Sequence, residues 1–393
     1  MEYFRLFLSA LVTTIVDFVG PLGQRKPPKL LVVKLDHLGD VVTATPVFRT
    51  LREAFPDARI DALVGSWAVP LVVGNPHLDR ILTYDSRRFS RSEAKREGLG
   101  HRLRQMRAVA AHRYTHIIEL RGDSWTLLLP FLSGSRSRVD RGTVRLESWL
   151  TRRMWAFGGA PARPEPIHEV ETNMAVIEPL LGKPASRSSP RPSNPSRRVE
   201  VFITDEDRRA LAARTKALGI PDDAALVTIH PGATWRPRAW RPERFAEVAR
   251  AILGRYPVHV CFVGTTEELD IADRLMILVP DRRAHFLFDL RLMETATLIQ
   301  RSVLFIGSDS GIAHIAAACG TPLIALYGPQ DPRRFGPWSP RAVTLHKPVP
   351  CFPCKQKVCV VPNNPCVNLI FAEAVVRNAE AVLGPPVEMP LTP

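Results

Sequence analysis

The chain lacks an apolar run long enough to cross a membrane, because no hydrophobic segment reaches the roughly 18–20 residues that a span needs. It also lacks the GxxxxGK[ST] phosphate loop, a glycine-rich dinucleotide fingerprint, the HExxH zinc motif and the GxSxG elbow. These absences argue against multi-pass membrane proteins, P-loop NTPases, simple dehydrogenases, zinc proteases and α/β hydrolases.

Acidic residues are fewer than basic residues in this chain. The 393 residues include 53 Lys and Arg against 39 Asp and Glu, which gives a formal net charge of +14. This excess calls for an anionic partner, which could be nucleic acid, an acidic membrane face, or a phosphorylated or carboxylated substrate. A hydrophobic share of 45% is enough for a large core, and the length predicts two domains as the simplest count.

Cysteine is sparse, with six residues, which fits a reducing cytoplasm better than a disulfide-rich secreted protein. Two of them stand alone in apolar segments and are expected to be buried, namely Cys261 and Cys319. The other four crowd into 16 residues, as Cys351, Cys354, Cys359 and Cys366. Four thiols at this density could hold a structural zinc or iron ion, and free thiols or disulfides are the alternatives.

An apolar stretch opens the chain at 6–16 and is followed by Arg25, Lys26 and Lys29. It is too short to span a bilayer and has no A-x-A cleavage site, which argues against a signal peptide. An apolar helix trailed by cations could lie in a membrane interface. The alternative is a helix that packs on the protein itself.

Strands and helices alternate along the rest of the chain, which predicts parallel α/β sheets. The expected strands are 29–35, 58–64, 80–83, 116–120, 225–230, 258–263, 303–307 and 323–327, and the expected helices are 41–55, 242–253, 295–301 and 311–319. Residues 183–198 are rich in Pro, Ser and cations and contain no acid, as expected of a solvated linker. We therefore predict a leader at 1–28, domains at 29–182 and 199–370 that flank the linker and a ligand cleft, and a C-terminal helix and tail at 371–393.

The sharpest local feature is FIGSDSGIAH at 305–314, in which a strand leads through a Gly/Ser turn into a helix. The amides of Ser310, Gly311 and Ile312 would form an anion site that suits a diphosphate. An ordinary helix capped by Asp309 or Ser310 is the alternative.

A second loop, HPGAT at 230–234, also follows a strand, and Arg236, Arg238, Trp240 and Arg241 come after it. Arginine suits bidentate phosphate contacts, whereas the alternative is a solvated basic loop that Trp240 anchors to the core. Both loops follow the carboxyl ends of parallel strands, where open α/β sheets bind ligands.

A third motif, KLDHLGD at 34–40, follows the first strand. Asp40 could cap the helix that begins there, or it could act as a general base at the strand end. His37 is a weaker candidate for chemistry, because polar loop residues are common at such positions.

Three blocks of the chain, in this order, resemble glycosyltransferase family 9, the ADP-heptose:lipopolysaccharide heptosyltransferases. They are KLDHLGDVVTATPVFRTLREAFPDARI at 34–60, HPGATWRPRAWRPERFAEVA at 230–249 and FIGSDSGIAHIAAACGTPLIALYGPQDPRRFGP at 305–337. The resemblance extends over about residues 29–380. It implies an α/β protein of the GT-B fold, with two Rossmann-like domains facing across an interdomain cleft.

The resemblance also implies roles for individual residues. Asp40 matches the catalytic base of an inverting transfer, and Arg238 stands where the family often has lysine. The nucleotide-sugar donor would contact the second domain, and Glu267 or Glu268 would bind the ribose. The full donor set is Thr234, Arg238, Glu267, Asp309, Ser310, Gly311 and His314, and the acceptor set in the first domain is His37, Gly39 and Arg121.

The implied reaction moves a heptose from ADP-heptose onto a lipopolysaccharide core or a related envelope glycan. A protein heptosyltransferase, a nucleotide-sugar 2-epimerase and a basic nucleic-acid binder are the alternatives. No cofactor is expected for the chemistry, although the four cysteines are similar to those of family members that bind iron. The expected location is cytoplasmic and peripheral to the inner membrane. The basic stretches at 85–113 and 133–153 would face an anionic glycolipid there, with no nucleic acid bound.

Overall fold

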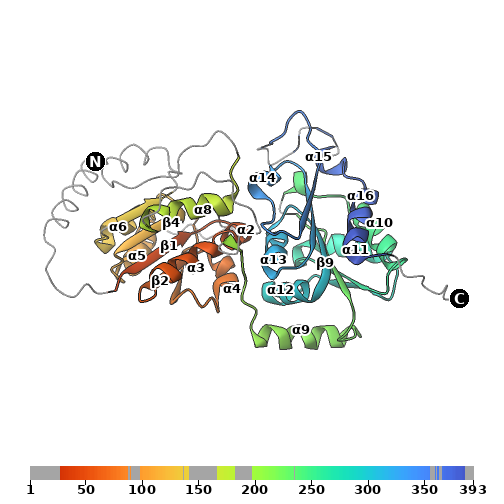
Figure 1. Ribbon diagram of the computed structural model, residues 1–393, viewed down its shortest axis with the longest axis horizontal. Helices are drawn as coiled ribbons and strands as arrows, with labels where there is room; N and C mark the ends of the chain where they lie inside the picture. Colours follow the sequence, from red (N-terminus) through yellow and green to blue (C-terminus); the bar gives the residue numbers. More distant parts are fainter. Residues whose placement is uncertain are drawn as a thin grey trace. The chain divides into compact units, whose positions relative to one another are not determined.

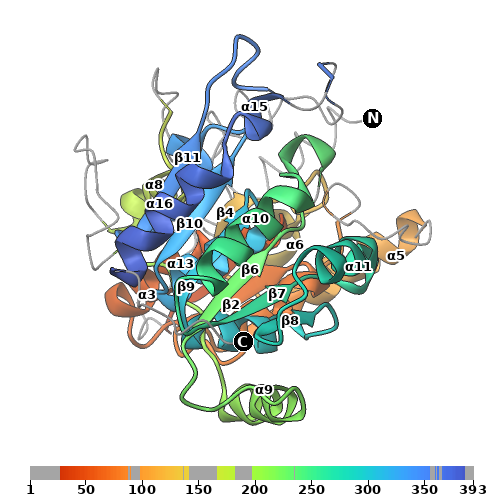
Figure 2. The ribbon, with the colours of Figure 1, turned by 90° about the vertical axis from the view of Figure 1, so that its right-hand side faces the viewer.

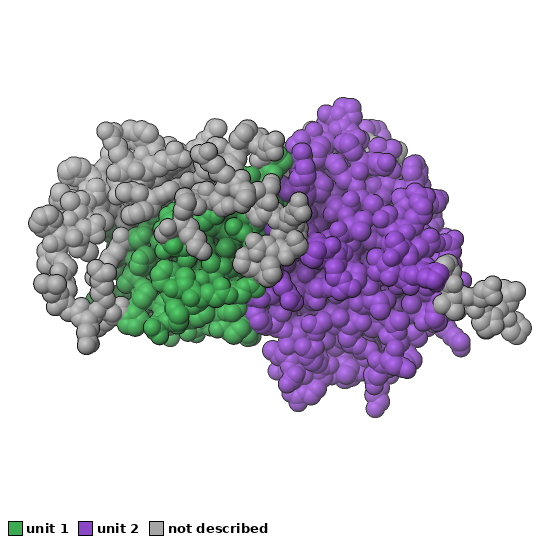
Figure 3. Space-filling view, viewed as in Figure 1, with its two compact units in different colours: residues 1–197 green, residues 198–393 purple. Residues whose placement is uncertain are grey.

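The computed structural model (Figure 1) describes residues 27–86, 89, 98–135, 137–140, 166–181, 197–233, 235–354, 359, 361–362 and 365–385. Nearly all of the expected leader and of the expected linker lies outside the described residues. The chain divides into two compact units, Met1–Arg197 and Arg198–Pro393 (Figure 3). In the described part of the chain, every helix is too short or too polar to cross a membrane.

The first unit is built on a five-stranded parallel sheet with the order β3-β2-β1-β4-β5. Its central strands β1 and β2 are each buried at five of six positions, as the apolar run of β1 predicts. The strands are β1 (Lys29–Lys34), β2 (Arg59–Val64), β3 (Arg80–Thr83), β4 (His116–Arg121) and β5 (Ser137–Asp140). The main helices are α2 (Leu38–Val42), α3 (Thr45–Ala54), α4 (Val69–Val72), α5 (Leu99–Ala110), α6 (Leu128–Ser133) and α8 (Glu169–Ile177).

The helix predicted at 41–55 is in fact two helices, α2 and α3. Pro46 lies in the first turn of α3, where its missing N–H has no partner to lose. The same proline would break a helix that ran through from α2. The break leaves α2 as a separate turn directly after β1.

The second unit is built on a six-stranded parallel sheet with the order β11-β10-β9-β6-β7-β8. The strands are β6 (Leu226–His230), β7 (His259–Val263), β8 (Ala284–Leu287), β9 (Ser302–Ser308), β10 (Leu323–Tyr327) and β11 (Ala342–His346). The helices are α9 (Asp205–Ala217), α10 (Pro242–Leu253), α11 (Leu269–Leu278), α12 (Leu292–Arg301), α13 (Gly311–Cys319), α14 (Pro332–Phe335), α15 (Pro365–Asn368) and α16 (Ala372–Leu383). Figure 2 shows α10 and α16 over one face of this sheet. Two parallel sheets with helices packed on them confirm the predicted α/β class.

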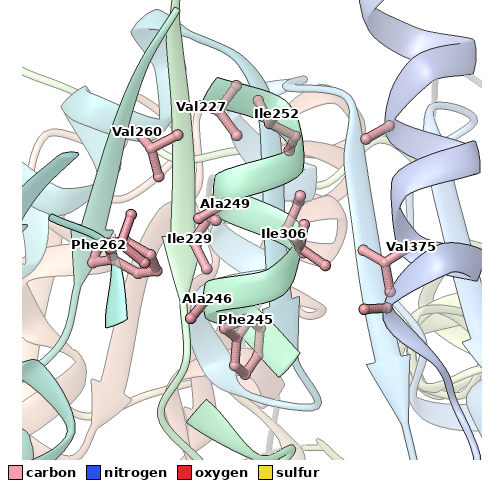
Figure 4. Close-up of a cluster of buried hydrophobic side chains, with 14 of the residues drawn as sticks. Val227, Ile229, Phe245, Ala246, Ala249, Ile252, Val260, Phe262, Ile306 and Val375 are labelled. Carbon is pink, nitrogen blue, oxygen red and sulfur yellow. The ribbon is translucent and has the colours of Figure 1, made fainter. Parts of the chain in front are cut away.

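The core of the second unit fills the space between its sheet and the helices α10 and α16 (Figure 4). Ile229 of β6 and Ile306 of β9 are fully buried beneath α10. Phe245 and Ile252 line the sheet-facing side of α10, and Val375 contributes from α16. This packing fixes β6 and β9, the two neighbouring strands whose carboxyl ends carry the loops singled out above.

Candidate functional site

Because β6, β7 and β9 run parallel, the loops that follow them lie at one edge of the second unit. His230 ends β6, Val263 ends β7 and Ser308 ends β9. Because β6 pairs with both β7 and β9, the three loops are neighbours in space. Of the expected donor residues, Thr234 lies outside the described residues.

Helix α13 presents its amino end at this edge. Ser310 is its N-cap residue, in an extended conformation, and no side chain makes a capping hydrogen bond there. Ser310 thus occupies the cap position that one alternative gave it, although its side chain makes no capping hydrogen bond. The Ser310 hydroxyl instead lies 3.3 Å from Nδ1 of His230. The first turn has no acidic residue, so its amides and the helix dipole favour an anion.

Arg238 and Asp309 meet beside this helix. The Arg238 Nε lies 3.3 Å from the Asp309 Oδ2, and their side chains are 18% and 5% exposed. The Trp235 ring covers the guanidinium at 4.5 Å from its centroid, which restricts its rotation. Burial, with the nearby Asp309 charge, raises the pKa of Tyr327 well above its usual value. Arg238 is thus held from two sides, by the Asp309 carboxylate at Nε and by the Trp235 ring.

The loop that holds Arg238 is fixed by Trp240. The Trp240 side chain is almost fully buried, its Nε1 donates to the Ile370 carbonyl at 3.0 Å, and its ring meets Phe245 edge-on. The anchoring role expected for Trp240 is therefore observed. It serves to hold Arg238 at the sheet edge, so the basic loop is not a freely solvated one.

Glu268, and not Glu267, lies at the strand ends. Its carboxylate accepts a hydrogen bond from the Thr265 amide at 2.9 Å, whereas Glu267 is exposed. A Cβ on Gly232 would lie 2.0 Å from Oε1 of Glu268, so only glycine allows the carboxylate to approach the loop after β6. Burial lowers the pKa of His230, although the Glu268 charge opposes this, and the imidazole is therefore neutral near pH 7.

His314 and Gly311 complete the described donor set. Gly311 is the first residue of α13, and His314 stands three residues later. Residues at i and i+3 share a helix face, so His314 follows Gly311 on the same side. Both are half-buried.

In the first unit, Asp40 lies in the first turn of α2. The N-cap residue is His37, so the alternative of Asp40 as the helix cap is wrong. The Asp40 carboxylate is half-buried, and no described residue is hydrogen-bonded to it. Gly39 is buried beside it. A carboxylate in this state can accept a proton from a bound molecule.

A buried charge cluster that the sequence reasoning missed fixes the loop before α2. The Lys34 side chain is fully buried, and its Nζ lies 3.3 Å from the Asp36 Oδ2. The Arg121 Nε lies 3.6 Å from the same oxygen, and the Trp67 indole donates to the Asp36 carbonyl at 3.0 Å. A lysine at the end of an otherwise apolar strand was the signal in the sequence.

Arg121 is the member of this cluster whose side chain reaches the surface. Its side chain is 32% exposed and lies over the Phe89 ring, 5.8 Å from the centroid. Phe89 also meets the His37 ring edge-on at 6.4 Å. The expected acceptor residues His37 and Arg121 are thus brought together around one aromatic ring, in the loop region that also contains Asp40.

The four clustered cysteines line one cavity of about 20 Å³, together with Pro237, Gly328 and Phe352. None of the six cysteines, all of which the structure describes, forms a disulfide. Among the described residues, no three His, Cys, Asp or Glu side chains are placed to hold one metal ion, so the structural zinc or iron is not supported. Burial, with a smaller contribution from Cys359 and Cys351, raises the pKa of the Cys366 thiol.

Of the two isolated cysteines, Cys261 is buried as expected, whereas Cys319 is only half-buried. Cys261 is fully buried in β7, and Cys319 is partly exposed as a residue but donates inward to the Ala296 carbonyl at 3.4 Å. Burial raises the pKa of each to about 12. Neither thiol is suited to nucleophilic chemistry.

The sequence profile of glycosyltransferase family 9 (heptosyltransferase) matches residues 102–364. Lipopolysaccharide heptosyltransferase 3 of Escherichia coli (strain K12) is 26% identical over 311 residues, which cover 77% of this chain and 83% of that protein. Lipopolysaccharide heptosyltransferase 1 of Pseudomonas aeruginosa is 25% identical over 338 residues, which cover 84% of this chain and 87% of that protein.

Solved structures are similar over almost the whole chain. A glycosyl transferase family 9 protein from Veillonella parvula DSM 2008 has a TM-score of 0.72 at 22% identity and covers 91% of this chain and 98% of that one. The E. coli heptosyltransferase WaaC with ADP has a TM-score of 0.64 at 19% identity and covers 90% of this chain and 99% of that one. These likenesses confirm the predicted fold, GT-B, with two Rossmann-like units.

Proposed function

The chain belongs to glycosyltransferase family 9, the heptosyltransferases, and on that premise we propose that it moves a heptose from ADP-heptose onto a lipopolysaccharide core or a related envelope glycan. As a family member it is a glycosyltransferase and needs no cofactor for the reaction. The names of its relatives support the heptose and the lipopolysaccharide. One observation carries the proposal, namely the uncapped amino end of α13 with Arg238 held beside it.

The second unit binds the donor in this proposal. The first-turn amides of α13 and the Arg238 guanidinium hold the diphosphate, because both favour an anion at the same sheet edge. The Glu268 carboxylate accepts hydrogen bonds from ribose hydroxyls, and Asp309 contacts the donor sugar. His314 lies one turn along α13 and completes the contacts.

The first unit supplies the base and binds the acceptor. Asp40 takes the proton of the acceptor hydroxyl while that oxygen attacks the anomeric carbon of the heptose. The new bond forms on the face opposite the phosphate, and the anomeric carbon–oxygen bond to the diphosphate breaks, so the configuration inverts. The bonding electron pair leaves with ADP, whose charge Arg238 and the helix amides stabilise.

In this scheme, Arg121 binds an anionic group of the acceptor. Asp36 and the Phe89 ring hold its guanidinium, and His37 and Gly39 supply the other proposed acceptor contacts. Phosphate or carboxylate groups of an envelope glycolipid would match this charge. The same acceptor would place the enzyme at the cytoplasmic face of the inner membrane.

The reaction is tested by incubating the purified full chain with ADP-heptose and a heptose-deficient lipopolysaccharide. We expect ADP release that depends on the acceptor, and a new glycosidic bond of inverted configuration by NMR. UDP- and GDP-sugars serve as controls and should not be consumed. Acceptor-independent release of an epimerised sugar would contradict the proposal and indicate an epimerase.

Glu268→Ala should weaken ADP binding about tenfold, because hydrogen bonds to a charged partner contribute about 1.5–3 kcal/mol and water replaces part of them. Isothermal titration calorimetry with ADP measures this. The matched control is Glu267→Ala, which removes an exposed carboxylate from the neighbouring position. Equal affinity losses in the two variants would contradict the assignment of the ribose contact to Glu268.

A further inference from the structure

Helices α5 and α6 expose apolar side chains on the first unit. The two helices pack against each other beside β4 (Figure 1). Leu99, the first residue of α5, is 73% exposed, and Phe131 of α6 is 42% exposed. Scattered exposed apolar residues are ordinary, but here they stand on two adjoining helices next to a dense group of cations.

The cations lie on α5. Arg104 and Arg107 are exposed, and residues 98–113 contain no Asp or Glu. Arg102 lies over the Trp125 ring, 5.8 Å from its centroid. No acidic side chain of this segment neutralises the helix, so its surface potential is positive.

This surface lies at the edge of the sheet where the acceptor residues are found. Trp125 belongs to the short connection between β4, which ends at Arg121, and α6. The contact between Arg102 and Trp125 therefore places the amino end of α5 at the carboxyl edge of the sheet. Leu99 stands at that amino end, close to the acceptor side of the first unit.

We propose that this surface docks on an anionic lipid bilayer. Its residues, called here the α5–α6 face, are Leu99, Arg102, Arg104, Arg107 and Phe131. Apolar and aromatic side chains enter the interfacial region of a bilayer while cations pair with lipid phosphates. Nucleic acid would match the cations but not the exposed leucine and phenylalanine. Docking would bring a lipid-borne acceptor to Arg121 and Asp40, and that consequence alone rests on the proposed function.

The test is cosedimentation of the full chain with vesicles of phosphatidylethanolamine and phosphatidylglycerol. Reversing Arg104 and Arg107 to Glu should lower the partition coefficient about tenfold or more, since each cation near an anionic surface adds to binding. Leu99→Ser should lower it as well, and at high salt only the electrostatic part should be lost. Unchanged ADP binding in each variant shows that the second unit is intact.

Matched controls come from the second unit. Ile277 of α11 is 79% exposed, so Ile277→Ser makes the same change as Leu99→Ser away from the α5–α6 face. Arg209→Glu with Lys216→Glu reverses two exposed charges on α9. Both controls should bind vesicles as the unchanged protein does.

Two results would overturn the inference. One is equal vesicle binding by the α5–α6 variants and the controls, which would assign any membrane contact to another segment. The other is equal binding of the unchanged protein to purely zwitterionic vesicles. Transfer to a delipidated, water-soluble acceptor measures the proposed function separately, because it needs no membrane.

Discussion

Asp40→Asn should lower kcat for sugar transfer about 10²–10⁴-fold, the usual contribution of a positioned general base. Asparagine keeps the size and the position of the side chain but cannot accept the proton of the acceptor hydroxyl. Because Asp40 is in the first unit and the proposed donor contacts are in the second, affinity for ADP-heptose should stay unchanged. Steady-state kinetics with the lipopolysaccharide acceptor and calorimetry with the donor measure the two quantities.

Asp57→Asn is the control for Asp40→Asn. Asp57 is an exposed carboxylate in the turn before β2, so its loss should leave transfer within about twofold, as surface changes usually do. Near-normal transfer by Asp40→Asn would remove Asp40 as the base. A large fall in donor affinity would likewise contradict the division of roles between the units.

Arg238→Met should lower kcat/KM about 10²–10³-fold, as expected when one preorganised contact to a leaving group is removed. Methionine fills much of the same space but leaves the diphosphate charge unmatched. It also leaves Asp309, whose side chain is 5% exposed, without its ion-pair partner. Arg238→Lys should recover part of the activity, because an ammonium restores the charge but not the planar, two-pronged geometry.

Arg236→Met is the matched variant for Arg238→Met. Arg236 is exposed two residues earlier in the same loop, and its replacement should change kcat/KM little. The thermal unfolding midpoint of each variant separates a loss of the diphosphate contact from a loss of stability. If Arg236→Met and Arg238→Met lose activity equally, general loop charge explains the effect and the specific contact is refuted.

The central strands of both sheets were predictable because burial on both faces requires continuous apolar runs. The predicted 225–230 and 323–327 agree with β6 and β10 within one residue. The edge strands β5, β8 and β11 were missed. All five residues of β11 are half-buried, and β8 alternates between buried and half-buried positions, so neither has the pattern of a central strand.

The site was predictable at the level of motifs but not of contacts. The sequence could not choose between Glu267 and Glu268, because that choice depends on the open space over Gly232. It also could not show that Lys34 and Arg121 converge on Asp36, since their pairing depends on the register of β1 and β4. The structural metal is not supported among the described residues, because spacing along the chain does not by itself give the geometry of a metal site.

Gly328 shows how the cysteine segment and the donor loop depend on each other. A Cβ at this position would lie 3.0 Å from the Cβ of Val367, 3.2 Å from the Cys366 sulfur and 3.4 Å from the Pro237 carbonyl oxygen. Three stretches that are far apart in the sequence therefore pack closely around Gly328, where a side chain would crowd its neighbours. Pro237 directly precedes Arg238, so the position of Arg238 depends on the packing around Cys366. The Cys366 side chain therefore helps to set the shape of the loop that holds Arg238.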